Sequence, residues 1–352
     1  MKIAKTDLKN FDQNGLINYV ESLKQPAFRG RQLMAWLYKP GIHDFSQMTD
    51  LAKKFREILD ADAYISSFAA PIIERSSDGC IKFGFHLADG HVIEAVLIPE
   101  EDRNTLCVSS QVGCAMQCSF CLTGTMGFRR NLSPAEIVNQ VCAVRDFLHI
   151  ENAGQETVPL EITNIVFMGM GEPLNNLDNL LTSLSILTEQ KGLDFTGRRI
   201  TVSTCGIVPK MRPLGENSAV NLAVSLHAIN DATRDTLMPI NKKYPLKELL
   251  EACRTYPMPK RRRIMFEYTL LQGINDSDSD ARELARRLRP IPCKINLLAY
   301  NESPALPYRS PSRQRLLAFQ EILRQSHYSV FIRSSRGADI AAACGQLAGK
   351  HN

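Results

Sequence analysis

The sequence predicts an α/β protein in which most of the chain forms a complete or partial β/α barrel. Strand-like apolar segments alternate with segments of helical periodicity from about residue 105 onward, which implies a parallel sheet covered by helices. About 250 residues follow this point, and that length is enough for such a barrel. The first 100 residues have a different pattern, so the chain of 352 residues should contain more than one domain.

The N-terminal part, residues 1–62, is predicted to be a small accessory domain of short helices. Apolar residues recur at helical spacing over Gly15–Lys24, Arg29–Tyr38 and Gln47–Leu59. Residues 63–100 should form an antiparallel β extension, because two Asp-Gly turns flank the strand-like segment CIKFGFHL and a second such segment, HVIEAVLIP, follows it. The polar segment PEEDRN marks the expected boundary to a main domain over residues 101–352.

Six strand–helix units are predicted in this main domain. The strand-like segments are TLCVSS, ITNIVFMG, RITVST, NLAVSLH, RIMFEYTLL and CKINLLAY, and YSVFIR is a last strand. Helices are expected at 133–149, 177–190, near 208, and at 246–256, 278–288 and 312–325. Ser133 followed by Pro134 is typical of a helix N-terminus. Barrels carry their chemistry at the carboxyl ends of the strands, so the loops there are the first place to look for function.

The composition excludes a disordered or fibrous protein, since 44% of the residues are hydrophobic and 22% are charged. The net charge of +5 permits a polyanionic partner without requiring one. The N-terminus has no signal-peptide core, and no apolar stretch approaches the roughly 18 residues of a membrane helix. We therefore expect a soluble, cytoplasmic protein whose thiols stay reduced. Ten cysteines in such a protein indicate metal or redox chemistry rather than a disulfide scaffold.

The strongest motif is a cluster of three cysteines, Cys114, Cys118 and Cys121, in the loop after the first barrel strand. A structural zinc site would need four protein ligands, and no histidine lies near these three. Three unrelated packing cysteines are improbable at this spacing in one polar loop. The pattern favours a four-iron cluster that has three protein ligands and one iron open to another molecule.

The C-x3-C-x2-C spacing at this place resembles the radical S-adenosylmethionine (SAM) superfamily. The resemblance implies one [4Fe-4S] cluster whose open iron binds the methionine part of SAM, and whose electron produces a 5′-deoxyadenosyl radical. The segment after the second barrel strand looks like the Gly-Glu-Pro motif of the superfamily, in which Gly171 and Glu172 would hold the methionine amino group. Residues at the ends of later strands would contact the rest of the cofactor, although turn or cap duty is the plainer reading of each; they are Ser203, Ser225, Leu226, His227 and Asn301.

Four segments in order, CVSSQVGCAMQCSFC, MGMGEP, LMPIN and ACGQLAG, closely resemble the RlmN family. The resemblance covers essentially the whole chain, including the N-terminal segment FRGRQLMAWLYKPGIHDFSQMTDL. Members of that family methylate C2 of an adenine in 23S ribosomal RNA and in transfer RNA next to the anticodon. These RNAs are therefore the expected partners, together with an electron donor of the flavodoxin or ferredoxin type, and a monomer is expected.

The resemblance also implies roles for two more cysteines and a carboxylate. One SAM would methylate Cys344, and a second would supply the radical that activates this methyl group for addition to C2, so that two SAM are used per turnover. Cys107 would release the product by forming a transient disulfide with Cys344. Glu94 would be the proton acceptor, although an exposed face of a short edge strand is the plainer reading. The other five cysteines are expected to be packing residues: Cys80, Cys142, Cys205, Cys253 and Cys293.

Two alternatives stay open from the sequence. The first is a Cfr-type enzyme, which has the same functional cysteines and methylates C8 of adenine, conferring antibiotic resistance. The second is a non-catalytic, metal-stabilised RNA-binding protein. Basic residues that could contact RNA phosphates occur as the run Lys260–Arg263, as Arg129 and Arg130 after the cysteine loop, and as Arg29 and Arg31.

Overall fold

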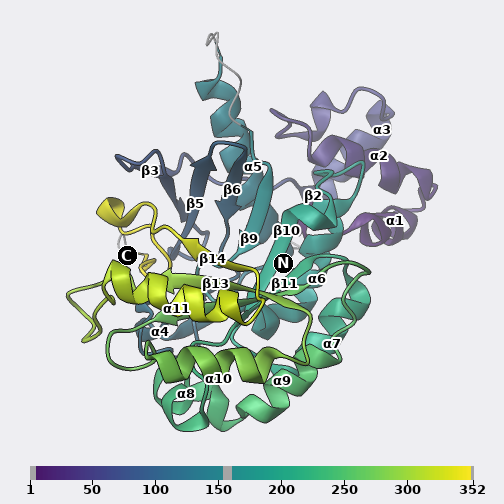
Figure 1. Ribbon diagram of the computed structural model, residues 1–352. Helices are drawn as coiled ribbons and strands as arrows, with labels where there is room; N and C mark the ends of the chain where they lie inside the picture. The colour runs from purple at the N-terminus through teal and green to yellow at the C-terminus, as the bar shows by residue number, and fades with distance from the viewer. Residues whose placement is uncertain (1–4, 154–160, 350–352) are drawn as a thin grey trace.

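The computed structural model describes residues 5–153 and 161–349. A ten-stranded sheet with the order β14-β13-β12-β11-β10-β9-β6-β5-β4-β3 forms its centre. From one edge to the other the strands are β14 (Val330–Arg333), β13 (Cys293–Ala299), β12 (Ile264–Leu270), β11 (Asn221–Ser225), β10 (Ile200–Thr204), β9 (Asn164–Phe167), β6 (Arg103–Cys107), β5 (Val92–Glu100), β4 (Ile81–His86) and β3 (Ile72–Arg75). The sheet has two free edges, so the barrel is partial (Figure 1).

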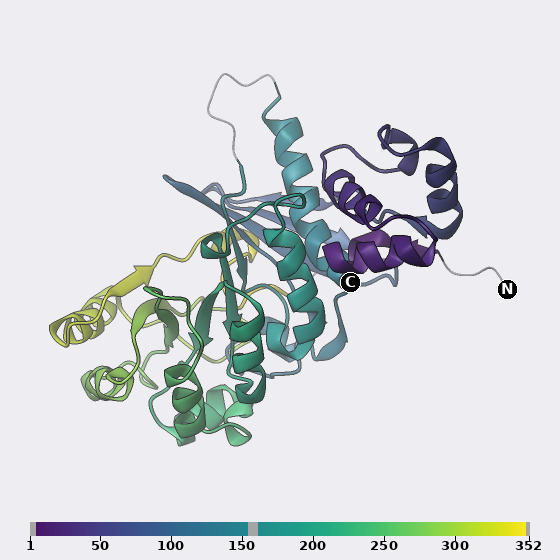
Figure 2. The same cartoon turned by 90° about the vertical axis from the view of Figure 1, so that its right-hand side faces the viewer.

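The seven strands from β6 to β14 are parallel to one another and form the barrel part. Helices follow the strands and cover the outer face of the sheet (Figures 1 and 2). They are α5 (Pro134–Glu151), α6 (Leu177–Thr188), α7 (Val208–Asn217), α8 (Asp231–Leu237), α9 (Leu246–Arg254), α10 (Asp278–Leu288) and α11 (Arg313–Gln325). The predicted α/β class and six strand–helix units with a last strand are therefore confirmed.

The antiparallel extension is part of the same sheet as the barrel. Strand β5 pairs with β6 in register from Val96 opposite Cys107 to Glu100 opposite Arg103. Strand β3 was not predicted from the sequence. Its four residues alternate between half-buried and exposed, and they lack the apolar run that marks β4 and β5. The division of the chain at residues 62 and 100 stays a prediction.

The N-terminal helices α1 (Gln13–Ser22), α2 (Phe28–Leu37) and α3 (Lys53–Asp62) lie to one side of the sheet, next to α5 (Figure 2). Lys9 Nζ donates to Asn139 Oδ1 of α5 at 2.8 Å. The first two helices agree with the prediction, but the third does not begin at Gln47. The carboxylate of Asp44 caps a separate short turn over Phe45–Gln47, and α3 starts only after it.

Local hydrogen bonds explain where the barrel helices begin. Ser133 caps α5 in a reciprocal capping box, because its hydroxyl accepts from the Glu136 amide at 3.2 Å and the Glu136 carboxylate accepts from the Ser133 amide at 2.9 Å. Helix α8 was not predicted, since its sequence DATRDTL is short and polar. It forms because the side chain of Asn230 accepts from the Thr233 amide at 2.8 Å.

In the described ranges, no helix combines the length and the apolar character that crossing a membrane requires.

Candidate active site

The three motif cysteines lie in a loop that a short hairpin closes. Strands β7 (Gln111–Gly113) and β8 (Phe128–Asn131) pair antiparallel, and the Cys114 amide donates to the Gly127 carbonyl at 3.0 Å. Cys121 stands at the N-terminus of the short helix α4 (Leu122–Thr125), where its amide donates to the Cys118 carbonyl at 3.1 Å. All three sulfur-bearing side chains line one cavity. The sequence had indicated a plain loop here and missed the hairpin.

Gly113 is the residue that lets this hairpin close. Its φ is +71°, and a Cβ on it would lie 1.9 Å from the Gly127 carbonyl oxygen. We expect Gly113→Ala to open the loop and to reduce the iron bound after anaerobic reconstitution by at least about tenfold, since relief of the clash must break the Cys114 hydrogen bond. Gly127→Ala is the matched control, because Gly127 has a similar φ of +73° but no atom near its Cβ position. Equal iron content in the two variants would contradict the prediction.

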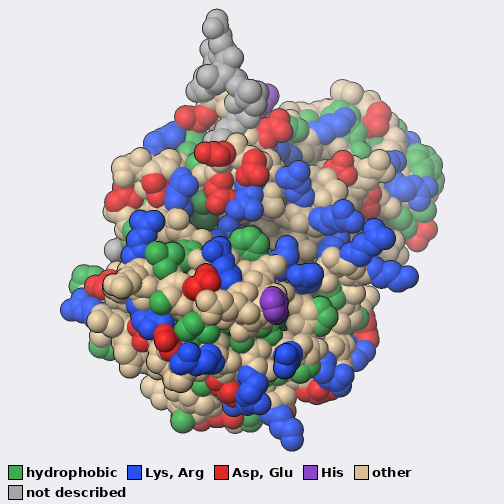
Figure 3. Space-filling model, in the orientation of Figure 1, with side chains coloured by type: hydrophobic (Ala, Val, Ile, Leu, Met, Phe, Trp, Pro, Cys, Tyr) green, Lys and Arg blue, Asp and Glu red, His purple; other side chains and the backbone are tan. Residues whose placement is uncertain are grey.

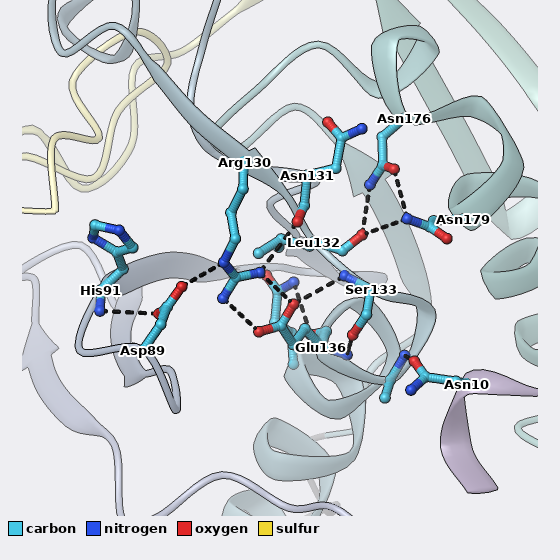
Figure 4. Close-up of polar contacts among 12 residues, drawn as sticks. Asn10, Asp89, His91, Arg130, Asn131, Leu132, Ser133, Glu136, Asn176 and Asn179 are labelled. Carbon is cyan, nitrogen blue, oxygen red and sulfur yellow. Dashed lines mark hydrogen bonds and ion pairs between the residues drawn. The ribbon is translucent and has the colours of Figure 1, made fainter. Parts of the chain in front are cut away.

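Further contacts fix the hairpin to its surroundings (Figure 4). Arg130 forms ion pairs with Asp89, in the turn between β4 and β5, and with Glu136 of α5, the latter at 2.8 Å. The amides of Asn176 and Asn179 both donate to the Leu132 carbonyl, at 2.7 and 3.1 Å. Arg130 is thus engaged with two carboxylates, and its contact with RNA stays a prediction.

The Gly-Glu-Pro segment follows β9 and faces the same cavity. Gly171 has a φ of +100°, and a Cβ there would lie 2.5 Å from the side chain of Gln111. The Glu172 carboxylate is buried and accepts from the Thr204 hydroxyl at 2.7 Å, the Cys205 amide at 2.8 Å and the Leu174 amide at 3.0 Å. Burial raises the pKa of Glu172, and these hydrogen bonds oppose the rise. The carboxylate is therefore rigidly placed at the cavity wall.

Four of the five other predicted cofactor contacts line this cavity, namely Ser203, Ser225, His227 and Asn301. Leu226 does not; its side chain is buried in the hydrophobic core. His227 Nδ1 accepts from the Thr269 amide at 2.9 Å, and its ring meets Phe120 edge-on at 4.9 Å. Burial, together with the nearby Arg234 charge, lowers the pKa of His227 to about 3. The ring is therefore neutral, with its remaining proton on Nε2.

The donor set of the loop suits an iron–sulfur cluster. No three Cys, His, Asp or Glu side chains in the described part of the chain are grouped as the ligands of a single metal ion. The loop cysteines surround a cavity instead, as a cluster needs when each thiolate binds a different iron. Burial raises the pKa of Cys114 to about 12 and also raises that of Cys118 well above its usual value, so bound iron would be needed to hold both as thiolates.

A second, larger cavity of about 610 Å³ adjoins the first, which is about 180 Å³. Cys107, at the end of β6, and Cys344 both line it, and both are free thiols. The structure therefore brings together two cysteines that are 237 positions apart in the sequence. Arg103, Lys294, Arg333 and Arg336 also line this cavity. Figure 3 shows Lys and Arg side chains around a hollow on one face of the molecule.

Cys344 lies on a C-terminal segment, residues 334–349, that crosses the cavity without regular strands. The Asn301 amide donates to the Cys344 carbonyl at 3.0 Å, and the Leu122 amide of the cysteine loop donates to the Gly345 carbonyl at 2.8 Å. Lys82 of β4 donates to the Ile340 carbonyl at 2.7 Å. The segment is thus held between the antiparallel extension on one side and the cysteine loop on the other.

The Glu94 carboxylate anchors the end of this C-terminal segment. It is 1% exposed on β5, its Oε2 accepts from the amides of Ala348 and Gly349 at 2.9 and 3.1 Å, and its Oε1 lies 3.7 Å from Lys82 Nζ. The exposed-face reading of Glu94 is therefore wrong. Glu94 does not line either of the two cavities described here, because residues 348 and 349 cover it.

The anchoring role of Glu94 can be separated from proton transfer. We expect Glu94→Ala to lower the hydrogen-exchange protection of residues 345–349 at least tenfold, since hydrogen bonds to a charged group each contribute about 1.5–3 kcal/mol. Glu94→Gln, which keeps an oxygen acceptor, should retain part of that protection. If both variants kept full protection, the contacts of Glu94 with Ala348 and Gly349 would not stabilise the segment.

Sequence reasoning missed Glu267 as a site residue. It lies on β12, lines both cavities, and accepts from the Asn296 amide at 2.8 Å. Burial raises the pKa of Glu267 to about 7, and its charge contributes to raising the pKa of Cys344. A carboxylate inside the apolar strand RIMFEYTLL was the signal that could have found it, because such a group is costly on a buried strand.

The shift of Glu267 predicts a pH-dependent stability. Its folded-state pKa lies above the unfolded value, so the native state retains a proton that the unfolded state loses, and stability falls as pH rises from about 4.5 to about 7. Glu267→Gln removes this loss. In anaerobic urea denaturation we expect the variant to match the wild type near pH 4.5 and to exceed it by about 3 kcal/mol at pH 8. A difference that does not vary with pH would contradict this assignment.

The basic run Lys260–Arg263 precedes β12 and so lies at the amino ends of the parallel strands, whereas the cysteine loop and the Gly-Glu-Pro segment follow the carboxyl ends. Arg262 is engaged with the carbonyl of Ala219. The basic residues that line a cavity together with Cys107 and Cys344 are the four named above for the second cavity, and none of them belongs to this run.

Comparison with known proteins gives consistent matches over the chain. A family model described as ribosomal RNA large subunit methyltransferase N-terminal domain matches residues 6–65, and one described as radical SAM superfamily matches residues 108–285. Two proteins named dual-specificity RNA methyltransferase RlmN are similar to it over 98% of this chain. The one from Desulfotalea psychrophila is 70% identical over 95% of its own length, and the one from Geobacter sulfurreducens is 53% identical over 92%.

One solved structure is similar over nearly its whole length. The crystal structure of a radical SAM methyltransferase from Sphaerobacter thermophilus superimposes with a TM-score of 0.88 at 43% identity. The match covers 98% of this chain and 99% of that one.

Proposed function

The chain belongs to the RlmN family of radical SAM RNA methyltransferases, and from this we propose that it methylates C2 of an adenine in 23S ribosomal RNA and in transfer RNA next to the anticodon. The observation that carries the proposal is the meeting of Cys107 and Cys344 at one cavity, directly beside the cavity that holds the cysteine loop. A metal-stabilised RNA-binding protein would have no use for this second pair of thiols.

The first cavity suits a [4Fe-4S] cluster with SAM. Cys114, Cys118 and Cys121 would bind three irons, and Gly171 and Glu172 would hold the methionine part of SAM. When bound, these groups supply a carbon radical able to remove hydrogen from an unactivated C–H bond. The strand-end residues Ser203, Ser225, His227 and Asn301 would orient the cofactor. The neutral His227 ring offers its Nε2 proton as a hydrogen-bond donor, and Leu226 would contribute only through its backbone.

Cys344 is proposed to accept the methyl group that is later delivered to the base. Its side chain is open to the cavity, while the surrounding protein raises the pKa of its thiol to about 11. The thiol must therefore lose its proton as the methyl group arrives, which gives a neutral thioether, and two SAM molecules are needed per product. The methyl carbon on Cys344, once it has lost a hydrogen atom, would bond to C2 of the adenine, and this adduct would then lose the C2 proton and return one electron to the cluster. The Cys107 thiolate would attack the Cys344 sulfur and break its bond to that carbon, which takes up a proton, so that the methylated adenine leaves and a disulfide remains. Glu94 lines neither cavity, so it could accept the C2 proton only after a rearrangement that connects it to them.

RNA would enter through the second cavity, where phosphates could contact Lys294. Arg103 and Arg333 pair with Glu100, and Arg336 pairs with Asp78, so these three would contact phosphates by exchanging their carboxylate partners. The target adenine must leave its stack to reach the two thiols, which favours single-stranded or unfolded RNA. The cluster and the disulfide both need electrons. We therefore propose a reducing cytoplasmic setting and an electron donor of the flavodoxin or ferredoxin type. We also propose that the protein acts as a monomer.

The test is methylation of RNA by the reconstituted protein. It is incubated without oxygen with SAM, a strong reductant, and a fragment of 23S ribosomal RNA or an adenine-containing transfer RNA. The product is digested to nucleosides and compared with 2-methyladenosine and 8-methyladenosine standards by mass spectrometry. We expect 2-methyladenosine in both RNAs. Formation of 8-methyladenosine would support the Cfr-type alternative, and no methylated base at all would contradict the proposal.

A further inference from the structure

One fully buried charge is not used by the mechanism above. Arg234 of α8 has no solvent exposure, and its guanidinium makes four hydrogen bonds. Its partners are the carbonyls of Leu226 at 3.1 Å, Cys205 at 2.7 Å and Ser225 at 3.1 Å, and the amide oxygen of Asn241 at 3.0 Å. All four acceptors are uncharged. Asp231 and Asp235 make contact with Asn241, which stands between them and the guanidinium.

The position of Arg234 relates it to the first cavity. Cys205 and Ser225, whose carbonyls it binds, follow or end β10 and β11 and line that cavity. At the other end of α8, the Leu237 carbonyl accepts from the amide of Ser119 at 3.0 Å, and Ser119 lies between two of the loop cysteines. Met238, the next residue, lines the cavity. Helix α8 therefore packs directly behind the cysteine loop.

A buried guanidinium whose direct hydrogen-bond partners are all neutral is costly, because it loses hydration and gains only dipoles in exchange. The acidic groups that interact electrostatically with Arg234 are the thiols of Cys205, Cys118 and Cys253 and, behind Asn241, the carboxylate of Asp231. Cys118 and Cys205 both interact electrostatically with Arg234, and Cys118 becomes a thiolate when it binds iron. Three thiolates give a four-iron cluster a net negative charge, and reduction makes that charge more negative by one electron. A fixed cation nearby stabilises the reduced form more than the oxidised form.

We propose that Arg234 is a positioning residue that supplies the buried counter-charge of the cluster, raises its reduction potential, and holds the ends of β10 and β11 against the cofactor. The inference rests on the proposed function, because it requires that the three loop cysteines hold a cluster. It assigns two separable effects to one side chain. The charge sets the potential, and the hydrogen bonds to Cys205 and Ser225 set the shape of the cofactor wall.

The experiment compares Arg234→Gln and Arg234→Lys in the full-length, anaerobically reconstituted protein. Iron and sulfide are quantified first, and the potential is then measured by redox titration monitored by electron paramagnetic resonance, without SAM. At the wild-type midpoint, Arg234→Gln should lower the ratio of reduced to oxidised cluster by about tenfold, which is about 59 mV for a one-electron couple. Arg234→Lys keeps the charge, so its midpoint should match the wild type, while its altered hydrogen bonds should weaken SAM binding.

The control is Arg212→Gln, because Arg212 is an exposed arginine of the neighbouring helix α7. A midpoint of Arg234→Gln equal to that of the control would overturn the proposal. If Arg234→Gln fails to hold iron, Arg234→Lys decides: a midpoint that departs from the wild type overturns the proposal, and a match supports it. A wild-type protein that binds no iron and sulfide would instead contradict the proposed function.

Discussion

Cys344→Ala should abolish RNA methylation, with a loss greater than about 10³-fold, on the scale seen when a covalent nucleophile is removed from other enzymes. The physical reason is that no other side chain can carry the methyl group at this place. Cys107 is buried at the end of a strand, and Cys121 would bind iron. After incubation with SAM, the intact mass of the wild type should rise by one methyl group, and that of the variant should not.

The control for this variant is Cys142→Ala, which removes a buried thiol of α5 that lines neither of the two cavities described here. It should keep the iron content, the methyl uptake and the RNA product of the wild type. Cys344→Ala should also keep its iron, because Cys344 is not one of the three loop cysteines. If the variant still took up a methyl group, the acceptor would be another residue and our assignment of Cys344 would be wrong.

Cys107→Ala should produce the opposite defect, in which the reaction begins but the product is not released. Methyl loading and addition to the base would proceed, because they involve Cys344, and the RNA would then remain covalently bound. We expect a protein–RNA adduct on denaturing gels in an amount close to one per active cluster, with free methylated RNA reduced at least about a hundredfold. The adduct should resist thiol reductants, since a carbon–sulfur bond holds it.

The burial of Cys107 bears on when the proposed release step can occur. The pKa of its thiol is raised, first by burial and then by the proximity of Cys344. Cys107 is therefore a poor nucleophile until a proton acceptor is in place, which restricts its attack to the loaded complex. The double variant Cys107→Ala, Cys344→Ala should form no adduct. Normal turnover by Cys107→Ala would contradict the proposed release step.

The sequence predicted the parts of the site that are local in the chain. The spacing of Cys114, Cys118 and Cys121 placed them in one loop, and the segment before Pro173 placed Glu172 at a strand end. The pattern of apolar segments was enough for the parallel sheet, because each strand is a short run bounded by polar residues. Such signals do not depend on which other segments lie alongside.

What the sequence could not predict depends on neighbours in space. Thr204 and Cys205 hold Glu172 because β9 and β10 are adjacent, and Asn296 reaches Glu267 because β12 and β13 are adjacent. Glu94 is a buried anchor only because the C-terminal segment returns to cover β5. In each case the partner is tens to hundreds of positions away, and no local pattern encodes it.

The anchored C-terminal segment would also decide which thiol reacts with the Cys344 sulfur, either Cys107 or a thiol in solution. Lys82, Asn301 and Leu122 hydrogen-bond to backbone carbonyls of this segment. These contacts limit the movement of Cys344 relative to Cys107. Groups held in this way behave as one molecule, and well-oriented pairs reach effective molarities of about 10⁵ M or more. Millimolar glutathione in the surrounding solution could not compete with such a partner. Dissolved thiols would therefore not release the RNA adduct, in agreement with the resistance expected of the Cys107→Ala adduct, and the enzyme would need them only afterwards to reduce its disulfide.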